Sequence, residues 1–316
     1  IAEKQGYKVT GCDLIPHNEF TTQFQNSQLI TGHDPKHLAS QATLGNVDLL
    51  VTTPAIFSLD PNNPELLEAH NKGIPIMTWQ EFVGKYLAKD KFVVAVCGTH
   101  GKTTTTAMIA EILEDANLDP TVLLGANIPG WKTNYRVGKG KYFVIEADEF
   151  NDNFLSYKPD ISVVTTIEMD HPEYYKDFDA YKESFKKFLS QTKTEIIANL
   201  SNGGVQEVLA SQGQALQGWR TQIQDYSKKL IDFPLQIPGH FNILNATAAY
   251  QVGLSLKINP EIIKKSLMEF TGAERRFEYI GEYNGAKVYS DFGHHPTEIA
   301  KTIEAVREKF PIQRIL

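Results

Sequence analysis

A lysine and a threonine follow two glycines at the end of an apolar run. Residues 93–97 are apolar, Gly98 and Gly101 come next, and Lys102 and Thr103 begin a segment with helical patterning. A strand, a glycine-containing turn and a helix in this order are typical of polyphosphate sites, because backbone N–H groups and a helix N-terminus attract anions. We therefore expect Lys102 on the β- and γ-phosphates of a nucleotide and the Thr103 hydroxyl on Mg²⁺.

The loop is a shortened version of the full phosphate-loop pattern. That pattern has a further glycine where this chain has Val96, so only Gly98-x-x-Gly101-Lys102-Thr103 remains. The alternative is a tight strand-to-helix turn with an accidental lysine. The coincidence of strand, glycines, Lys-Thr and helix favours the phosphate loop.

Acidic residues end two other apolar runs. Glu146 directly follows the run 142–145, and residues 165–172, which include His171, follow the run 161–164. In a parallel sheet these ends face the same edge as the phosphate loop, and Mg²⁺ prefers oxygen ligands. We predict that Glu146 binds Mg²⁺ and that His171 binds a second metal ion or contacts the phosphorylated substrate. The alternatives are an acidic turn and a structural histidine.

Two later segments place polar residues at helix starts. Asn242 and Asn245 lie one turn apart, so both amides could read an adenine edge, although Asn242 could instead cap the helix. Asp291, followed by His294 and His295, ends a strand before the predicted helix 296–309. This segment could be a metal site, a catalytic loop or an ordinary helix start.

The elements that must position these residues alternate between strand and helix. Residues 1–88 have short strands and helices in a parallel, Rossmann-like order, in which Asp13 could contact a ribose or lie in an exposed loop. Residues 89–271 continue the alternation, with helices at 103–116, 181–191, 242–256 and 260–270. From 277 the pattern resets to a hairpin around Asn284-Gly285 and a long helix. We predict an α/β chain with domains at 1–88, 89–271 and 272–316.

Composition excludes several classes of protein. The 316 residues are 41% apolar and have a formal net charge of −7 without a basic cluster, which argues against a nucleic-acid partner. The two cysteines predict no disulfide framework. No apolar run approaches the roughly 18 residues of a membrane span, and no export signal is visible, so we expect no membrane insertion and a cytoplasmic location.

Both ends suggest a piece of a longer protein. Residues 1–13 read as the end of a helix followed by a strand, so the first strand and glycine-rich loop of a Rossmann-like unit are expected before them. Residues 310–316 read as the start of a further strand.

Taken together, the motifs resemble those of the Mur ligases, the ATP-dependent amide ligases of peptidoglycan precursor synthesis. The resemblance covers essentially the whole chain. It rests on six motifs in the family's order, at residues 98–104, 146–149, 170–172, 239–246, 275–277 and 291–298. It implies three domains: a Rossmann-like N-terminal domain for a UDP-sugar, a central P-loop ATPase domain, and a Rossmann-like C-terminal domain, truncated here, for the amino acid.

The resemblance also implies roles for individual residues. Catalytic roles fall on Lys102, His171 and His294. Metal binding falls on Thr103, Glu146 and His171. Nucleotide binding falls on Gly98, Thr99, His100, Gly101, Lys102, Thr103, Thr104, Asn242, Asn245, Arg276 and Asp291.

The implied reaction joins L-alanine to the carboxylate of UDP-N-acetylmuramate through an acyl phosphate, with ATP and Mg²⁺. An alternative amine substrate is the cell-wall tripeptide of the recycling ligases, which tend to carry an insertion where residues 151–160 are compact here. A third possibility is a nucleotide-binding module without ligase activity. Phe292 stands where the family often has a tyrosine, which weakens the inference to L-alanine. The activity is expected of the full-length protein, and the sequence leaves the oligomeric state open.

Overall fold

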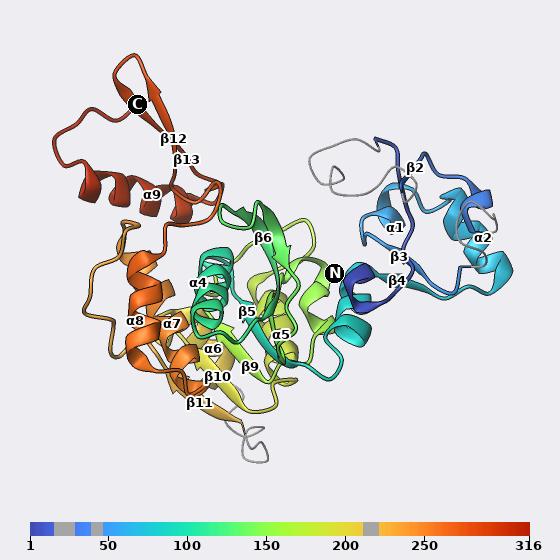
Figure 1. The fold of residues 1–316 in the computed structure, drawn as a ribbon, viewed down its shortest axis with the longest axis horizontal. Coiled ribbons are helices and arrows are strands. Elements are labelled where there is room, and N and C mark those ends of the chain that lie inside the picture. The colour runs from blue at the N-terminus through green and yellow to red at the C-terminus, as the bar shows by residue number, and fades with distance from the viewer. Residues whose placement is uncertain (16–28, 39–46, 211–220) are drawn as a thin grey trace. The chain divides into compact units, whose positions relative to one another are not determined.

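The structure, a computed structural model, describes residues 1–15, 29–38, 47–210 and 221–316. It forms two compact units, Ile1–Lys89 and Asp90–Leu316, and each is described by itself (Figure 1). Strands and helices alternate through both units, so the predicted α/β class is confirmed. Within the described residues, no helix is both long and apolar enough to cross a membrane.

The first unit consists of short elements. It contains two parallel strand pairs, β1 with β2 and β3 with β4, together with several short helices. The elements are η1 (Glu3–Gln5), β1 (Gly11–Asp13), β2 (Leu29–Thr31), η2 (Pro35–Leu38), β3 (Leu50–Thr52), α1 (Ile56–Leu59), α2 (Pro64–Lys72), β4 (Ile76–Thr78), α3 (Trp79–Phe82) and the π-helix η4 (Val83–Leu87). Helix α2 begins where the Asn63 side chain caps it and ends at Gly73, whose φ is +67°.

The second unit contains a seven-stranded sheet. Its strand order is β11-β10-β9-β5-β8-β6-β7, and every pair is parallel except β6 with β7. The elements are β5 (Phe92–Cys97), α4 (Lys102–Asp115), β6 (Thr121–Ile128), β7 (Thr133–Arg136), β8 (Tyr142–Glu146), η5 (Phe150–Ser156), β9 (Ile161–Val164), α5 (Phe178–Leu189), β10 (Glu195–Ala198), α6 (Gly203–Ala210), β11 (Gln222–Asp225), α7 (His240–Ser255), α8 (Pro260–Glu269), β12 (Glu278–Tyr283), β13 (Ala286–Ser290) and α9 (Pro296–Lys309).

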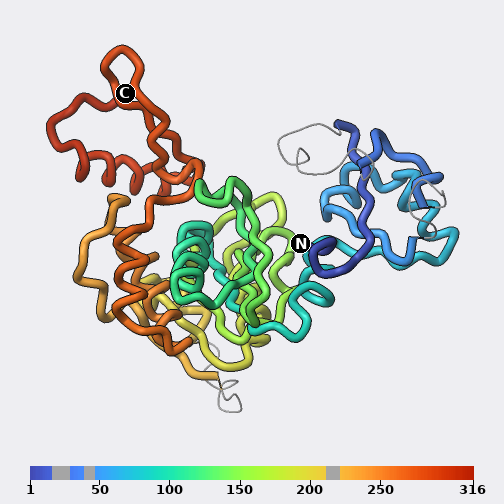
Figure 2. The backbone as a smooth tube through the Cα atoms, in the orientation of Figure 1, coloured from blue at the N-terminus to red at the C-terminus, as the bar shows by residue number. Residues whose placement is uncertain are grey.

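Strand β5 is the centre of this sheet and is buried on both faces. The run Val93–Cys97 is apolar throughout, as expected for a central parallel strand that is covered on both sides. Val94 and Val96 share a core with residues of α4, α7 and α8, which therefore cover one face (Figure 2). The carboxyl ends of β5, β8 and β9 consequently meet at one edge of the sheet, because β5 pairs with both neighbours.

The last elements are an antiparallel hairpin and a helix. Strands β12 and β13 turn at Asn284 and Gly285, which both have positive φ, as a two-residue hairpin turn requires. Helix α9 begins at Pro296, and the His295 side chain accepts a hydrogen bond from the Thr297 N–H. The segment runs as predicted from the sequence.

Some elements differ from the prediction. Strand β7 and helix α6 were not predicted, and α5 begins at Phe178, after an Asp177 cap, rather than at 181. Residues 212–236, a polar and weakly patterned stretch from which no helix is predicted, lie partly outside the described residues, and their described part contains β11. The domain boundaries near 88 and 271 stay predictions.

Candidate functional site

The phosphate-loop motif joins the end of β5 to the start of α4 through a tight turn. Gly98 has a φ of +129°, and a Cβ there would lie 2.2 Å from Thr165 Oγ1. Gly101 has a φ of +84°, and a Cβ there would lie 2.5 Å from Asn245 Oδ1. Both glycines are therefore required by backbone conformation and by close neighbours. The first N–H groups of α4, which have no partner within the helix, follow directly.

Lys102 lies folded over this loop. Its Nζ donates to Gly98 O at 2.7 Å and to Glu149 Oε2 at 2.8 Å, and a third oxygen, Glu149 Oε1, lies at 3.1 Å. The Glu149 carboxylate is fully buried, and the Lys102 side chain is 13% exposed. Burial alone would lower the pKa of Lys102, but the adjacent Glu149 carboxylate raises it above its ordinary range. The loop lysine is thus held as a cation.

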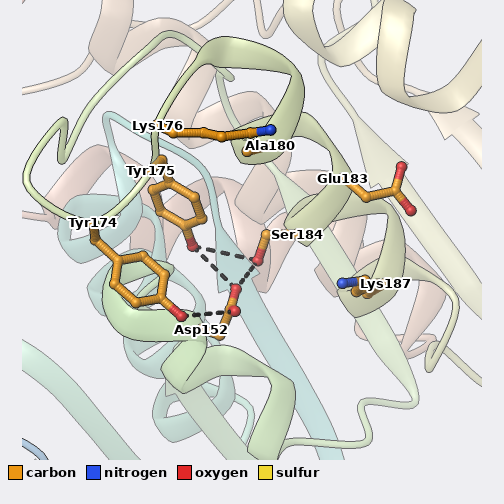
Figure 3. A pocket seen from close by; sticks show the side chains of 8 residues that line it. All are labelled: Asp152, Tyr174, Tyr175, Lys176, Ala180, Glu183, Ser184 and Lys187. Carbon is orange, nitrogen blue, oxygen red and sulfur yellow. Dashed lines mark hydrogen bonds between the residues drawn. The ribbon is translucent and has the colours of Figure 1, made fainter.

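Glu149 is held in turn by two tyrosines. The Tyr181 hydroxyl donates to Glu149 Oε1 at 3.0 Å, and the Tyr175 hydroxyl donates to the Glu149 carbonyl at 2.5 Å. Figure 3 shows the pocket beside it, where the Tyr174, Tyr175 and Ser184 hydroxyls converge on the Asp152 carboxylate. These bonds fix the segment that carries Glu149, and therefore the position of the lysine.

Thr103 and Glu146 form a second group at the same edge. Thr103 Oγ1 donates to Glu146 Oε1 at 2.9 Å, and Glu146 Oε2 accepts the Gly125 N–H at 2.6 Å. Burial raises the pKa of Glu146, against the opposing effects of Lys102 and these two donors. Arg276, from the segment before β12, donates from Nη2 to Thr103 Oγ1 at 3.3 Å. The predicted pair is therefore assembled, with a guanidinium beside it.

His171 joins a different set of acids. Its ring and the carboxylates of Asp148 and Glu149 place ligand atoms within 4.8 Å of one another. His171 itself has a φ of +54°, and its Nδ1 lies 3.1 Å from Glu173 Oε1. Predicted metal ligands Glu146 and His171 thus fall into two groups, one with Thr103 and one with Asp148 and Glu149.

His100 connects the phosphate loop to the start of α9. Its Nδ1 lies 3.1 Å from Glu298 Oε1, its Nε2 lies 3.5 Å from Glu168 Oε2, and its ring packs on His295 with centroids 4.8 Å apart. Burial alone would raise the pKa of Glu298, but hydrogen bonds from His100 and the His294 N–H lower it to about 2. Thr297 Oγ1 also donates to Glu168 Oε2 at 3.0 Å. The loop and α9 are therefore joined by charged hydrogen bonds.

The other predicted loop residues contact neighbouring groups of the protein. The Thr99 hydroxyl donates to Glu168 O and accepts the Glu168 N–H, both at 2.9 Å. The backbone N–H of His100 donates to Thr166 Oγ1 at 3.0 Å. Thr104 is buried in the first turn of α4. These contacts shape the loop, while any contact of Thr99, His100 or Thr104 with a nucleotide stays a prediction.

The two asparagines of α7 share a face, as predicted. Asn245 Nδ2 donates to Asn242 Oδ1 at 3.3 Å, and Asn242 Nδ2 donates to Pro238 O at 2.7 Å. The capping alternative for Asn242 does not hold, because the helix is preceded by Gly239 at the N-cap and Asn242 lies three residues inside it. Asn245 lies against Gly101, so this pair borders the phosphate loop.

Asp291 and His294 lie in the segment between β13 and α9. Asp291 accepts hydrogen bonds from the Phe277 and Gly293 N–H groups and from Thr302 Oγ1, so it fixes its own turn. The His294 side chain is 61% exposed, and its Nδ1 lies 3.3 Å from Phe292 O. Their predicted roles toward nucleotide and amine stay predictions.

Sequence reasoning missed three charged or ring contacts of this site. They are Glu149 on Lys102, Glu298 on His100, and His295 on the His100 ring. Glu149 and His295 stand inside motifs that the sequence singled out, so a signal was present. The sequence does not show which of these residues contact each other, because the partners are far apart along the chain. Lys102 and Glu149 are 47 positions apart, and His100 and Glu298 are 198 apart.

Three family models match the chain. They are "Mur ligase family, catalytic domain" over residues 1–91, "Mur ligase middle domain" over residues 96–253, and "Mur ligase, glutamate ligase domain" over residues 275–316. Among curated proteins, the chain is 34% identical to a UDP-N-acetylmuramate–L-alanine ligase of Aquifex aeolicus, over 100% of this chain and 72% of that protein. It is 37% identical to the one of Desulforapulum autotrophicum, over 98% of this chain and 71% of that protein.

Solved structures with the same fold include two ligases. The UDP-N-acetylmuramate-alanine ligase of Thermotoga maritima matches with a TM-score of 0.68 and 27% identity, over 84% of this chain and 64% of that one. A murein peptide ligase of Psychrobacter arcticus matches with a TM-score of 0.78 and 24% identity, over 99% of this chain and 73% of that one. At that identity, the second likeness shows the fold alone.

Proposed function

Because this chain belongs to the Mur ligase family, we propose that it is the ATP-dependent ligase that joins L-alanine to UDP-N-acetylmuramate. The observation that carries the proposal is a phosphate loop with a lysine held as a cation, in a chain that is 34–37% identical over nearly its whole length to relatives of that name. The reaction belongs to peptidoglycan precursor synthesis.

We assign the triphosphate of ATP to the loop between β5 and α4. Lys102 has three N–H donors, and Glu149 and Gly98 O accept from it now. A phosphate oxygen can replace the neutral Gly98 carbonyl, while the Glu149 carboxylate keeps the ammonium in place. The N-terminal N–H groups of α4 supply further donors for the anion. Asn242 and Asn245, which border the loop, are assigned to the nucleotide, as is Arg276.

The Thr103 hydroxyl and the Glu146 carboxylate suit Mg²⁺. They offer oxygen ligands 2.9 Å apart in a buried setting, and Mg²⁺ is a hard cation that takes oxygen ligands. Among the described residues, the buried Glu146 carboxylate accepts hydrogen bonds from two neutral donors, Thr103 Oγ1 and the Gly125 N–H. A buried carboxylate in this setting favours a site that a metal ion completes. When bound, Mg²⁺ neutralises charge on the phosphates. Asp148 and His171 offer ligands for a second ion, because Glu149 is already engaged by Lys102.

The chemistry proceeds in two balanced steps. The substrate carboxylate attacks the γ-phosphorus of ATP, a new O–P bond forms, the bond to the β-phosphate oxygen breaks, and ADP leaves. The amino group of L-alanine then attacks the acyl carbon, phosphate leaves and the nitrogen loses a proton. The protein's share is positioning and electrostatic stabilisation, with Lys102 beside the phosphate that is transferred and then released.

The three domains divide these tasks in our proposal. Residues 1–88 bind the UDP-sugar, residues 89–271 bind ATP, and residues 272–316 begin the domain that brings the amine. The bonds from His100 and Thr103 to Glu298 and Arg276 support a nucleotide site completed by the third segment. His294 is assigned to the incoming amine. A cytoplasmic location belongs to the proposal too, since the two cysteines are unpaired thiols and the second substrate is ATP.

The test is ADP release by the full-length protein with UDP-N-acetylmuramate, ATP and Mg²⁺. The amine is L-alanine in one reaction and the cell-wall tripeptide in a second, and a third reaction has no amine. Release that depends on L-alanine supports the proposal. Release that needs the tripeptide would make the protein the recycling ligase, and release that ignores both co-substrates would leave only a nucleotide-hydrolysing module.

A further inference from the structure

Four side chains of metal-binding type meet inside the unit Ile1–Lys89, outside the site described above. Cys12 is the middle residue of β1, His33 follows β2, His37 lies in η2, and Glu65 is in the first turn of α2. Parallel pairing places Cys12 opposite Ile30 of β2, and His33, two residues beyond the end of β2, lies beside the cysteine. Asn63 accepts the Glu65 N–H at 3.0 Å, which fixes the start of α2 and aims the carboxylate inward.

The ligand atoms of these residues are close together. Cys12 Sγ lies 3.0 Å from Glu65 Oε2 and 3.4 Å from His33 Nδ1, and His33 Nδ1 lies 3.3 Å from Glu65 Oε2. Ligands of a tetrahedral zinc ion, at bonds of about 2.0–2.3 Å, are separated from one another by roughly 3.2–3.7 Å. The triangle is therefore near the size of one coordination shell and needs only small side-chain movements to surround an ion.

The buried Glu65 carboxylate is contacted by side chains that are themselves metal ligands in other proteins. The residue is 5% exposed, and no lysine or arginine pairs with it among the described residues. Its carboxylate is contacted by the Cys12 thiol, by His33 and, at 2.7 Å from Oε1, by His37 Nδ1. A buried carboxylate has to be paired or hydrogen-bonded, and here every side-chain partner is itself a metal-ligand type.

We propose that Cys12, His33 and Glu65 form a binding site for a divalent transition-metal ion of the zinc class, with His37 as a positioning residue. A thiolate, an imidazole and a carboxylate suit Zn²⁺ or Co²⁺, whereas Mg²⁺ takes oxygen ligands, so this site differs in kind from the one at the phosphate loop. His37 holds the other oxygen of Glu65, as outer partners of metal ligands commonly do. The bound ion ties β1, the turn after β2 and α2 together.

Binding has a defined proton balance. Without an ion the Cys12 thiol donates to Glu65 Oε2 at 3.0 Å, so it carries its proton. The metal–sulfur bond forms as the S–H bond breaks, and the proton leaves to solvent. No electron transfer is involved.

Cobalt spectroscopy of the full-length protein tests this site without an activity assay. Co²⁺ bound to a thiolate gives a sulfur-to-cobalt charge-transfer band, and the other two His/carboxylate clusters of the described residues contain no thiol. The matched control is Cys97, which is buried on β5 and is the other of the two cysteines in these 316 residues. We expect one thiolate band in the wild type and in Cys97→Ser, and none in Cys12→Ser. His37→Ala is expected to weaken Co²⁺ and Zn²⁺ binding 10- to 100-fold.

Metal competition and measurements on the variants complete the test. Zn²⁺ added in equal amount should displace Co²⁺ and abolish the band, while millimolar Mg²⁺ should leave it unchanged. Circular dichroism of Cys12→Ser checks that the variant is folded, and His33→Ala provides a second variant that should lose the band. Absence of the band in the wild type, or its persistence in Cys12→Ser or His33→Ala, would overturn the proposal and leave an ordinary hydrogen-bonded thiol.

Discussion

The ion pair between Lys102 and Glu149 makes a prediction about stability as well as catalysis. The two charged groups are 2.8 Å apart, and the Glu149 side chain is fully buried. At an effective dielectric constant of about 20, unit charges at this distance attract by about 6 kcal/mol. Desolvation offsets much of this attraction, but removing one partner of a buried pair destabilises a protein by about 3–5 kcal/mol, because the other charge stays behind.

The perturbation is Lys102→Met, compared with Glu149→Gln and with the double variant. Lys102→Met leaves the buried carboxylate with Tyr181 as its side-chain donor, so we expect a loss of about 3–5 kcal/mol in the free energy of unfolding. Glu149→Gln should lose less, since the 13% exposed lysine keeps Gly98 O and some solvent. The double variant removes both charges and should return to within about 1 kcal/mol of the wild type, a coupling of about 3 kcal/mol.

Urea unfolding followed by circular dichroism measures the stabilities, and ADP release measures function. Lys102→Met and the double variant should both lose ADP release, although only the first is destabilised. A Lys102→Met protein as stable as the wild type, or additive single and double variants, would refute the reasoning.

Three other predictions concern Glu146, Arg276 and Glu111. Glu146→Ala should raise the Mg²⁺ concentration for half-maximal ADP release at least 10-fold, because a buried oxygen ligand next to Thr103 is lost; an unchanged requirement would move the metal role to Asp148. Arg276→Ala should raise the KM for ATP about 10-fold, with Arg276→Lys only partly restoring it, and equal KM values would remove the arginine from the nucleotide site. Glu111→Gln concerns stability: burial, then Asp115 and Glu114, raise the pKa of Glu111 to about 7 from 4.5, so the folded state holds a proton that the unfolded state loses. The contribution of Glu111 to wild-type stability should therefore fall between about pH 4.5 and 7, and urea unfolding should find the variant more stable by at most about 3 kcal/mol at pH 8 but not at pH 4.5; parallel pH profiles of wild type and variant would contradict this.

Elements with strong local signals could be predicted from the sequence. Helix α2 has proline at its first position and glycine after its end, and α9 begins at a proline, so their limits are as expected. Strand β5 is a continuous apolar run, as central parallel strands are. In each case the information lies within a few residues of the element.

Elements without such signals were missed for identifiable reasons. Strand β7, with the sequence Thr-Asn-Tyr-Arg, is an antiparallel edge strand without apolar alternation, so only its pairing with β6 defines it. Helix α6 begins with Gly203 and Gly204, which have low helix propensity. A Cβ on Gly204 would lie 2.0 Å from Ile167 O, so the glycine serves packing rather than helix formation.

In the candidate site, too, some features could be predicted from the local sequence and others could not. Strand-end acids and the loop lysine are visible locally, and β5 pairing with β8 and β9 brings their ends together as the parallel layout implies. Which acid meets which base depends on tertiary packing. Glu149 rather than Glu146 holds Lys102, and Glu298 of α9 reaches His100. Periodicity and spacing carry no information on such distant pairs.

The most direct test of the central claim is ADP release by the full-length protein with UDP-N-acetylmuramate, ATP and Mg²⁺, with L-alanine and the cell-wall tripeptide supplied in separate reactions. We predict release that requires both the UDP-sugar and L-alanine and that is lost in Lys102→Met. Release with the tripeptide alone, or release that is independent of both co-substrates, would contradict the assignment as an L-alanine ligase.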